Sequence, residues 1–114
     1  MPLVDVTYHQ SVPVSELRRL ADLLPNLVAQ AVECPEEPWT GPAQVGDIEI
    51  RFRPKSEHDI GELRIVIELR TRRLEGRLAD QQRRADLIRD HLAGVVSGPI
   101  GVWLMLTEGA WSQT

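Results

Sequence analysis

The sequence predicts one α/β (α+β) domain built from two strand–helix–strand halves. Hydrophobic periodicities run in the order strand, helix, strand, and the same order then repeats. The two helical segments share a short similar run, "RRLADLL" at 18–24 and "RRADLI" at 83–88, which favours a duplicated unit. At 114 residues the chain has the length of a single domain. We therefore expect one domain over 1–114, with halves of about 1–57 and 58–114.

The first half begins with "LVDVTY" (Leu3–Tyr8), whose β-branched residues predict a strand. A helix is expected next, capped by Ser11, with Pro13 in its first turn. Its apolar residues recur at helical spacing: Leu17, Leu20, Leu24, Leu27, Val28 and Ala31. Pro25 interrupts this stripe, so we expect the helix to be kinked or split there.

The segment "DIEIRFRP" (Asp47–Pro54) alternates strictly between apolar and charged residues and predicts a half-buried strand. Two helices can cover only one face of a four-stranded sheet. We expect the other face to carry residues such as Ile48, Ile50 and Phe52 and to need a partner, which predicts an oligomer.

The second half repeats this order. "LRIVIELR" (Leu63–Arg70) predicts a strand, a basic turn follows, 78–96 predicts the second helix, and 100–108 predicts the last strand. Strands joined through a helix are expected to be parallel, with the two helices on one face of the sheet.

Composition narrows the classes of function. The single cysteine fits a reducing compartment, and no leader or membrane-spanning run is recognised, so a cytoplasmic protein without membrane partners is expected. A net charge of −4 argues against nucleic acid as a partner. The arginines of 70–84 are interleaved with acidic residues, which is typical of a solvated, salt-bridged surface.

Pro2 stands at the start of the first predicted strand and allows two interpretations. A proline is tolerated there because its missing N–H costs no ladder bond. Alternatively, removal of Met1 would leave a free secondary amine, which can transfer protons. An α-amino group has a pKa near ~8, and burial or nearby cations lower it toward neutrality.

Several segments resemble the tautomerase superfamily. Pro2 and "LEGRLADQQ" (Leu74–Gln82) resemble 4-oxalocrotonate tautomerase, "LPNLVAQAVECP" resembles 5-carboxymethyl-2-hydroxymuconate isomerase, and "WLMLTEGAWSQ" resembles malonate semialdehyde decarboxylase. The resemblance implies a homotrimer whose sites lie around the N-terminal proline. It also implies a cofactor-independent isomerase without a metal, in which Pro2 is the general base for enol–keto or double-bond isomerisation of a small 2-oxo or 2-hydroxy unsaturated carboxylate.

The resemblance also implies an arginine that binds the substrate carboxylate. Arg77 occupies the "EGR" position, Arg73 and Arg70 are the next candidates, and Trp111 is expected to wall the site. The carboxylates of the loop, Glu36 and Glu37, are either plain loop residues or an acid at the site. Two alternatives stay open: a decarboxylase or hydratase of the same fold with Pro2 as general acid, and a non-catalytic trimeric binding protein.

Overall fold

The fold is a four-stranded mixed sheet with three helices, seen in a computed structural model that describes residues 2–44 and 46–114. The elements in chain order are β1 (Leu3–Tyr8), α1 (Val14–Val32), β2 (Glu49–Pro54), β3 (Ile65–Arg72), α2 (Glu75–Leu78), α3 (Gln81–Ala93) and β4 (Ile100–Thr107).

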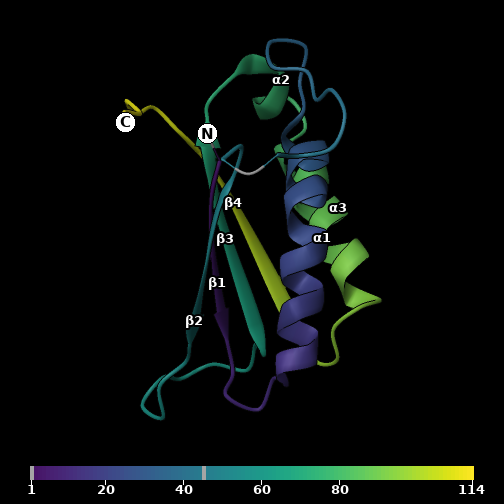
Figure 1. Ribbon diagram of the computed structural model, residues 1–114, viewed down its shortest axis with the longest axis vertical. Coiled ribbons are helices and arrows are strands. Elements are labelled where there is room, and N and C mark those ends of the chain that lie inside the picture. The colour runs from purple at the N-terminus through teal and green to yellow at the C-terminus, as the bar shows by residue number, and fades with distance from the viewer. Residues whose placement is uncertain (1, 45) are drawn as a thin grey trace.

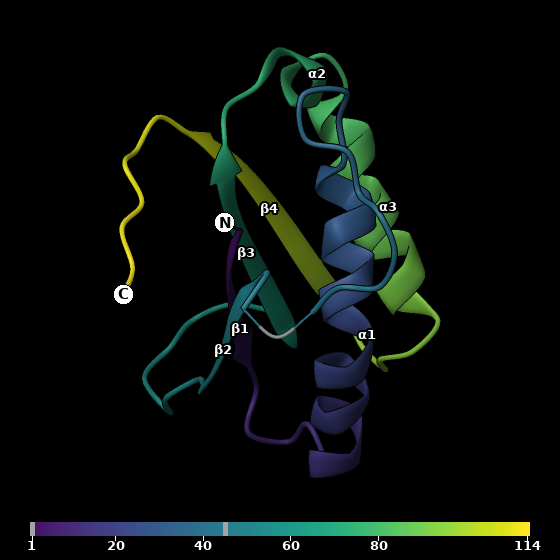
Figure 2. The ribbon, with the colours of Figure 1, turned by 45° about the horizontal axis from the view of Figure 1, so that its top comes forward.

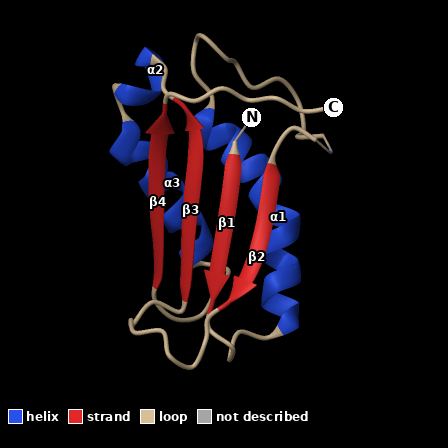
Figure 3. Cartoon of the chain, turned by 90° about the vertical axis from the view of Figure 1, so that its left-hand side faces the viewer, coloured by secondary structure: helices blue, strands red, loops and turns tan. Residues whose placement is uncertain are grey.

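The strands lie in the order β2-β1-β3-β4 (Figure 3). β1 pairs with β2 and β3 pairs with β4, both in parallel, as expected for strands joined through helices. The two central strands, β1 and β3, are antiparallel, with Leu3 opposite Arg70. The start of β1 and the ends of β3, α1 and β4 consequently meet at one end of the sheet, which we call the upper end.

The helices α1 and α3 lie side by side on one face of the sheet (Figures 1 and 2). Between them and the strands is an aliphatic core, whose fully buried side chains include Leu20, Leu24, Val28, Ile67 and Ile88. These residues come from both halves of the chain, so the halves share a single core.

The expectation that Ile48, Ile50 and Phe52 face away from the helices is wrong. These side chains pack against the core, because Ile50 lies opposite Val4 and Phe52 opposite Val6, and both valines are fully buried. Alternation along the strands places charged residues on the other face instead.

Helix α1 differs from the expectation at its start. Pro13, not Ser11, occupies the N-cap position. The helix also continues through Pro25 without being split, since buried residues on both sides of the proline pack on the same sheet. The carbonyl that Pro25 leaves without its helical N–H partner belongs to Ala21, an exposed residue, where water can satisfy it.

The second half also differs from the expectation. The turn expected over 70–77 is divided between the end of β3 and the single-turn helix α2, and the expected helix over 78–96 begins only at Gln81. Asp80 interrupts the helical path with φ −137° and ψ 37°. The interruption turns α2 away from α3 and toward the end of α1 (Figures 1 and 2).

Candidate functional site

Pro2 lies at the upper end of the sheet, directly before β1. Its carbonyl accepts a hydrogen bond of 3.1 Å from the backbone N–H of Glu49, and this bond holds the residue beside β2. The ring lines a cavity of about 300 Å³, which we call the Pro2 cavity. The expected removal of Met1 concerns a residue outside the described part of the chain.

The walls of the Pro2 cavity come from several segments that are distant in sequence. Its polar and aromatic lining consists of Glu33, Glu37, Trp39, Thr40, Asp47 and Arg77. Among the described residues, three carboxylates and one arginine therefore line this cavity together with Pro2. An excess of anions favours the protonated form of an amine placed among them.

Arg77 reaches this cavity as a buried residue with only 3% of its surface exposed. Its Nε donates to the carbonyl of Val32 at 2.7 Å, and its Nη1 donates to the carbonyl of Arg72 at 3.0 Å. The same Nη1 lies 3.4 Å from Oε2 of Glu37. Much of its hydrogen-bonding capacity is thus used within the protein, at the end of α1 and the end of β3.

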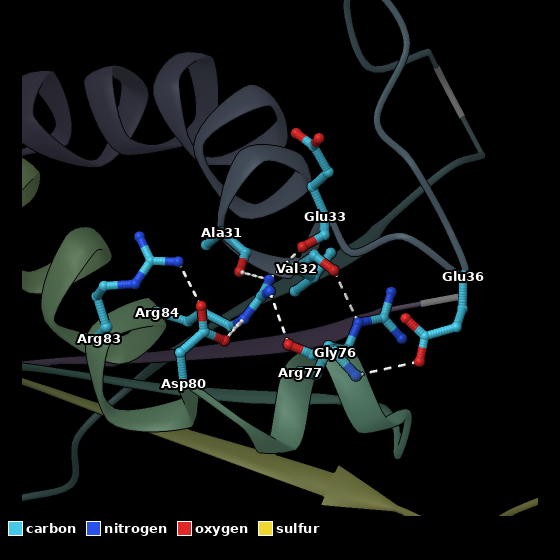
Figure 4. Close-up of polar contacts among 9 residues, drawn as sticks. All are labelled: Ala31, Val32, Glu33, Glu36, Gly76, Arg77, Asp80, Arg83 and Arg84. Atoms are coloured by element: carbon cyan, nitrogen blue, oxygen red, sulfur yellow. Dashed lines mark hydrogen bonds and ion pairs between the residues drawn. The ribbon is translucent and has the colours of Figure 1, made fainter.

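Arg84 makes a second set of contacts beside Arg77 (Figure 4). It donates to the carbonyls of Ala31, Glu33 and Gly76, and its Nε pairs with Asp80. Helix α1 has no basic residue in its last turn, so these two arginines from the second half supply donors to its final carbonyls.

A backbone contact joins α2 to the turn after α1. The N–H of Gly76 donates to Oε2 of Glu36 at 3.1 Å, and this hydrogen bond is the main reason that the pKa of Glu36 is lowered from its usual range. A Cβ at Gly76 would lie 2.6 Å from Oε1 of Glu36 and 2.9 Å from Cδ of Pro35. Only glycine allows this close approach.

A second cavity of about 440 Å³, which we call the Trp111 cavity, lies beside the start of β1. Its lining includes Leu3, Glu37, Arg70, Arg72 and Trp111. Glu37 lines this cavity as well as the Pro2 cavity, so its carboxylate stands between the two.

The remaining predicted arginines have partners. Arg70 lies 2.9 Å from Asp5, a side chain that is 13% exposed and is also approached by Arg51 and Arg53 from β2. Arg73 pairs with Glu108 at 3.0 Å and lines a depression at the end of β4 that shares Arg72 and Thr107 with the Trp111 cavity. Of the predicted residues, Pro2 and Arg77 thus share one cavity, Arg70 and Trp111 share the neighbouring one, and Arg73 lies beside the second cavity without lining it.

The residues that the sequence did not single out are Glu33, Trp39, Asp47 and Arg72. For Glu33, Trp39 and Asp47 a signal was present, since a β-α-β unit returns the chain after its helix to the edge where its first strand began. The acidic and aromatic residues of 33–47 were therefore bound to lie near Pro2.

No model of a known protein family matches the chain, and no curated protein matches it. Within the described part of the chain, no helix combines the length and the apolar character needed to cross a membrane.

Proposed function

We propose that this protein is a cofactor-independent isomerase of the tautomerase superfamily, which uses the amine of Pro2 after loss of Met1. One observation carries the proposal: Pro2 and Arg77, the two residues that the resemblance favours most, line the same cavity although they lie 75 positions apart in the sequence. An amine and a cation around one cavity are the groups needed to move a proton beside the carbonyl of a carboxylate substrate.

In this proposal Pro2 takes a proton from the 2-hydroxyl of an enol, or from a carbon beside the carbonyl of a 2-oxo acid, and the same proton is returned to another carbon of the small unsaturated carboxylate. An arginine stabilises the carboxylate and the enolate oxygen, with Arg77, Arg73 and Arg70 as the proposed cations and Trp111 as an apolar wall. The parallel outer pairs and the strand–helix–strand order of each half support a duplicated unit.

The charged face of the sheet supports the proposed homotrimer. Asp5 sits among Arg51, Arg53 and Arg70 on the face that no helix covers, and its Oδ1 is a buried acceptor without a hydrogen bond from the described residues. A second copy seated on this face would supply the hydrogen-bond donor that this acceptor lacks within one chain. Light scattering coupled to size exclusion is expected to give three times the chain mass.

The test of the proposed function begins with the intact mass, which should show loss of Met1. Ketonisation of phenylenolpyruvate or 2-hydroxymuconate is then compared between the wild type and Pro2→Ala. We expect kcat/KM to fall by about 10²–10⁴-fold in this variant, because it loses the secondary amine that transfers the proton. Pro54→Ala, at the opposite end of β1's partner strand, is the matched control. Equal rates for wild type and Pro2→Ala would leave the non-catalytic binding protein as the better interpretation.

A second candidate is favoured by the three carboxylates of the Pro2 cavity, Glu33, Glu37 and Asp47. These anions favour a protonated amine, which is the form needed for a decarboxylase or hydratase with Pro2 as general acid. The pH dependence separates the two candidates. Activity that rises with pH through the amine's titration indicates a general base, whereas activity that falls indicates a general acid.

A further inference from the structure

Among the described residues, Arg77 is the one basic residue of the Pro2 cavity, and its contacts reach three segments around it. It donates to the carbonyl of Val32 at the end of α1 and to the carbonyl of Arg72 at the end of β3, and it pairs with Glu37. Its side chain therefore connects a helix, a strand and a loop, beside a residue, Glu37, that lines both cavities. Figure 4 shows its contact with the end of α1.

The turn that carries Glu37 is held from two further sides. Within the turn, the N–H of Glu37 donates to the carbonyl of Cys34 at 3.0 Å, and the N–H of Cys34 donates back at 3.2 Å. From α2, the N–H of Gly76 donates to the carboxylate of Glu36. Because α2 holds Glu36, the neighbour of Glu37 in this turn, the position of α2 affects the position of Glu37.

Arg84 fixes the place of α2. It joins the carbonyl of Gly76 in α2, at 3.0 Å, to the carbonyl of Ala31 in α1, at 2.9 Å. Since Arg84 is also nearly buried, with 8% of its surface exposed, few alternative positions are open to the short helix.

We propose that Arg77 is a positioning residue, which holds the Glu37 carboxylate at the Pro2 cavity and thereby controls the proton affinity of the Pro2 amine. This inference rests on the proposed function in that Pro2 is the N-terminal residue. It assigns to Arg77 a role that acts through Glu37, in addition to the contact with the substrate carboxylate proposed above.

The other charges around Pro2 come from every neighbouring element. Glu33 faces the cavity from the end of α1, Asp47 faces it from the segment before β2, and Glu49 belongs to β2 itself. On the β3 side, Arg70 and Arg72 line the Trp111 cavity together with Leu3 and Glu37. Glu37 is the carboxylate that Arg77 contacts, so it is the anion whose position depends on Arg77.

The two possible roles of Arg77 predict opposite changes in the pKa of the Pro2 amine when Arg77 is removed. A cation that acts directly on Pro2 lowers the pKa of its amine, so its removal would raise that pKa. A residue that acts by holding Glu37 near the amine has the reverse effect, because the anion moves away when the residue is removed. The sign of one measured shift therefore decides between them.

The experiment is a ¹⁵N NMR titration of proline-labelled protein whose mass shows that Met1 is gone. Of the eight prolines, only an N-terminal one has a nitrogen that titrates. Glu37→Gln is expected to lower the pKa of the Pro2 amine by roughly one pH unit. Arg77→Met and Arg77→Lys should both lower it, and Arg77→Met combined with Glu37→Gln should lower it no further than Glu37→Gln alone. Arg83→Gln is the control, since Arg83 is exposed and pairs with the same Asp80 as Arg84.

Gly76→Ala tests the same inference without changing any charge, and it serves if an Arg77 variant does not fold. The added Cβ pushes the 34–37 turn away from α2, so the pKa of the Pro2 amine should again fall. The inference is overturned if the pKa of the Pro2 amine rises in Arg77→Met, or if Arg77→Lys leaves that pKa at its wild-type value. It is also overturned if the pKa of the amine is unchanged in every folded variant of Arg77 and Gly76. The titration measures the pKa of the Pro2 amine and needs no assay of activity. Its outcome is therefore distinct from a failure of the proposed function, which the kinetics of Pro2→Ala test.

Discussion

The two ends of the sheet are both closed by arginines, but only the upper end combines that closure with the cavities of Pro2 and Trp111. At the lower end, Arg64 donates to Ser97 at 2.6 Å and to the carbonyl of Ser11, and it pairs with Glu16 at 3.2 Å. Like the arginines of the upper end, it joins the first half of the chain to the second.

The ends differ in how deeply their arginines are buried. At the lower end Arg64 donates to the carbonyls of Ser97 and Ser11 and to the Ser97 hydroxyl, and it pairs with Glu16, but its side chain is 20% exposed. At the upper end Arg77 and Arg84 are nearly buried and bind mainly backbone carbonyls. Buried backbone groups have no access to water when their partner is lost. We therefore expect the contacts of Arg77 and Arg84 to contribute more to the free energy of unfolding than those of Arg64.

Replacing Arg84 should give the largest effect. Arg84→Met leaves the carbonyls of Ala31 and Gly76 without their donor and leaves Asp80 with one partner fewer. We expect the free energy of unfolding in urea to fall by about 3 kcal/mol. Arg83→Ala removes the exposed partner of the same carboxylate, at 75% side-chain exposure, and should cost less than about 0.5 kcal/mol. Equal losses in the two variants would contradict the comparison.

The corresponding change at the lower end should be smaller. Arg64→Met removes the contacts to Ser97, Ser11 and Glu16, but water can replace part of them at this partly exposed corner. The free energy of unfolding should fall by about 1–2 kcal/mol, measured in urea beside Arg19→Gln as an exposed control. A loss larger than that of Arg84→Met would reverse the ranking of the two ends.

A glycine at each end sharpens the comparison further. Gly76→Ala meets Cδ of Pro35 at 2.9 Å and Cβ of Cys34 at 3.0 Å, which are stiff neighbours, so we expect a loss of about 2 kcal/mol. Gly101→Ala meets Cδ1 of Leu63 at 2.9 Å, and this flexible, partly exposed side chain can move away. Its melting temperature should stay closer to that of the wild type, and the opposite order would contradict this account.

Acid should weaken the upper end through Asp80. Hydrogen bonds from Arg83 and Arg84 are the main cause that holds the pKa of Asp80 below its usual range. Because the pKa is lower in the folded chain, this carboxylate stabilises the fold fully above about pH 4 and loses that contribution as pH falls further. The stability difference between wild type and Asp80→Asn, followed by urea unfolding, should therefore shrink below about pH 4. A difference that is constant down to pH 2 would exclude this linkage.

Most of the fold followed from local patterns. β1 was predicted with the bounds it has, the strands joined through helices are parallel, and the apolar stripe of α1 is the part of it that is buried. Such patterns are visible in the sequence because each element must match its own period to a buried face.

The errors arose where a residue's neighbours are distant in sequence. The alternation of Ile50 and Phe52 showed that one face of β2 is apolar, but not which face the helices cover; that depends on pairing with Val4 and Val6. Helix α2 was missed because its four residues are stabilised less by their own propensity than by contacts with Glu36 in the turn after α1 and with Arg84 of α3.

By itself, the sequence determined the order of the elements, the aliphatic core and the choice of Pro2 as the candidate centre. Only the tertiary structure decided what surrounds Pro2. The carboxylates of the 33–47 loop line the same cavity as Pro2, and Arg77 is buried among backbone carbonyls. Arg70 forms an ion pair with Asp5. The physical reason is that a charge's partners are set by distance in space, and antiparallel pairing of β1 with β3 joins segments about 65 residues apart.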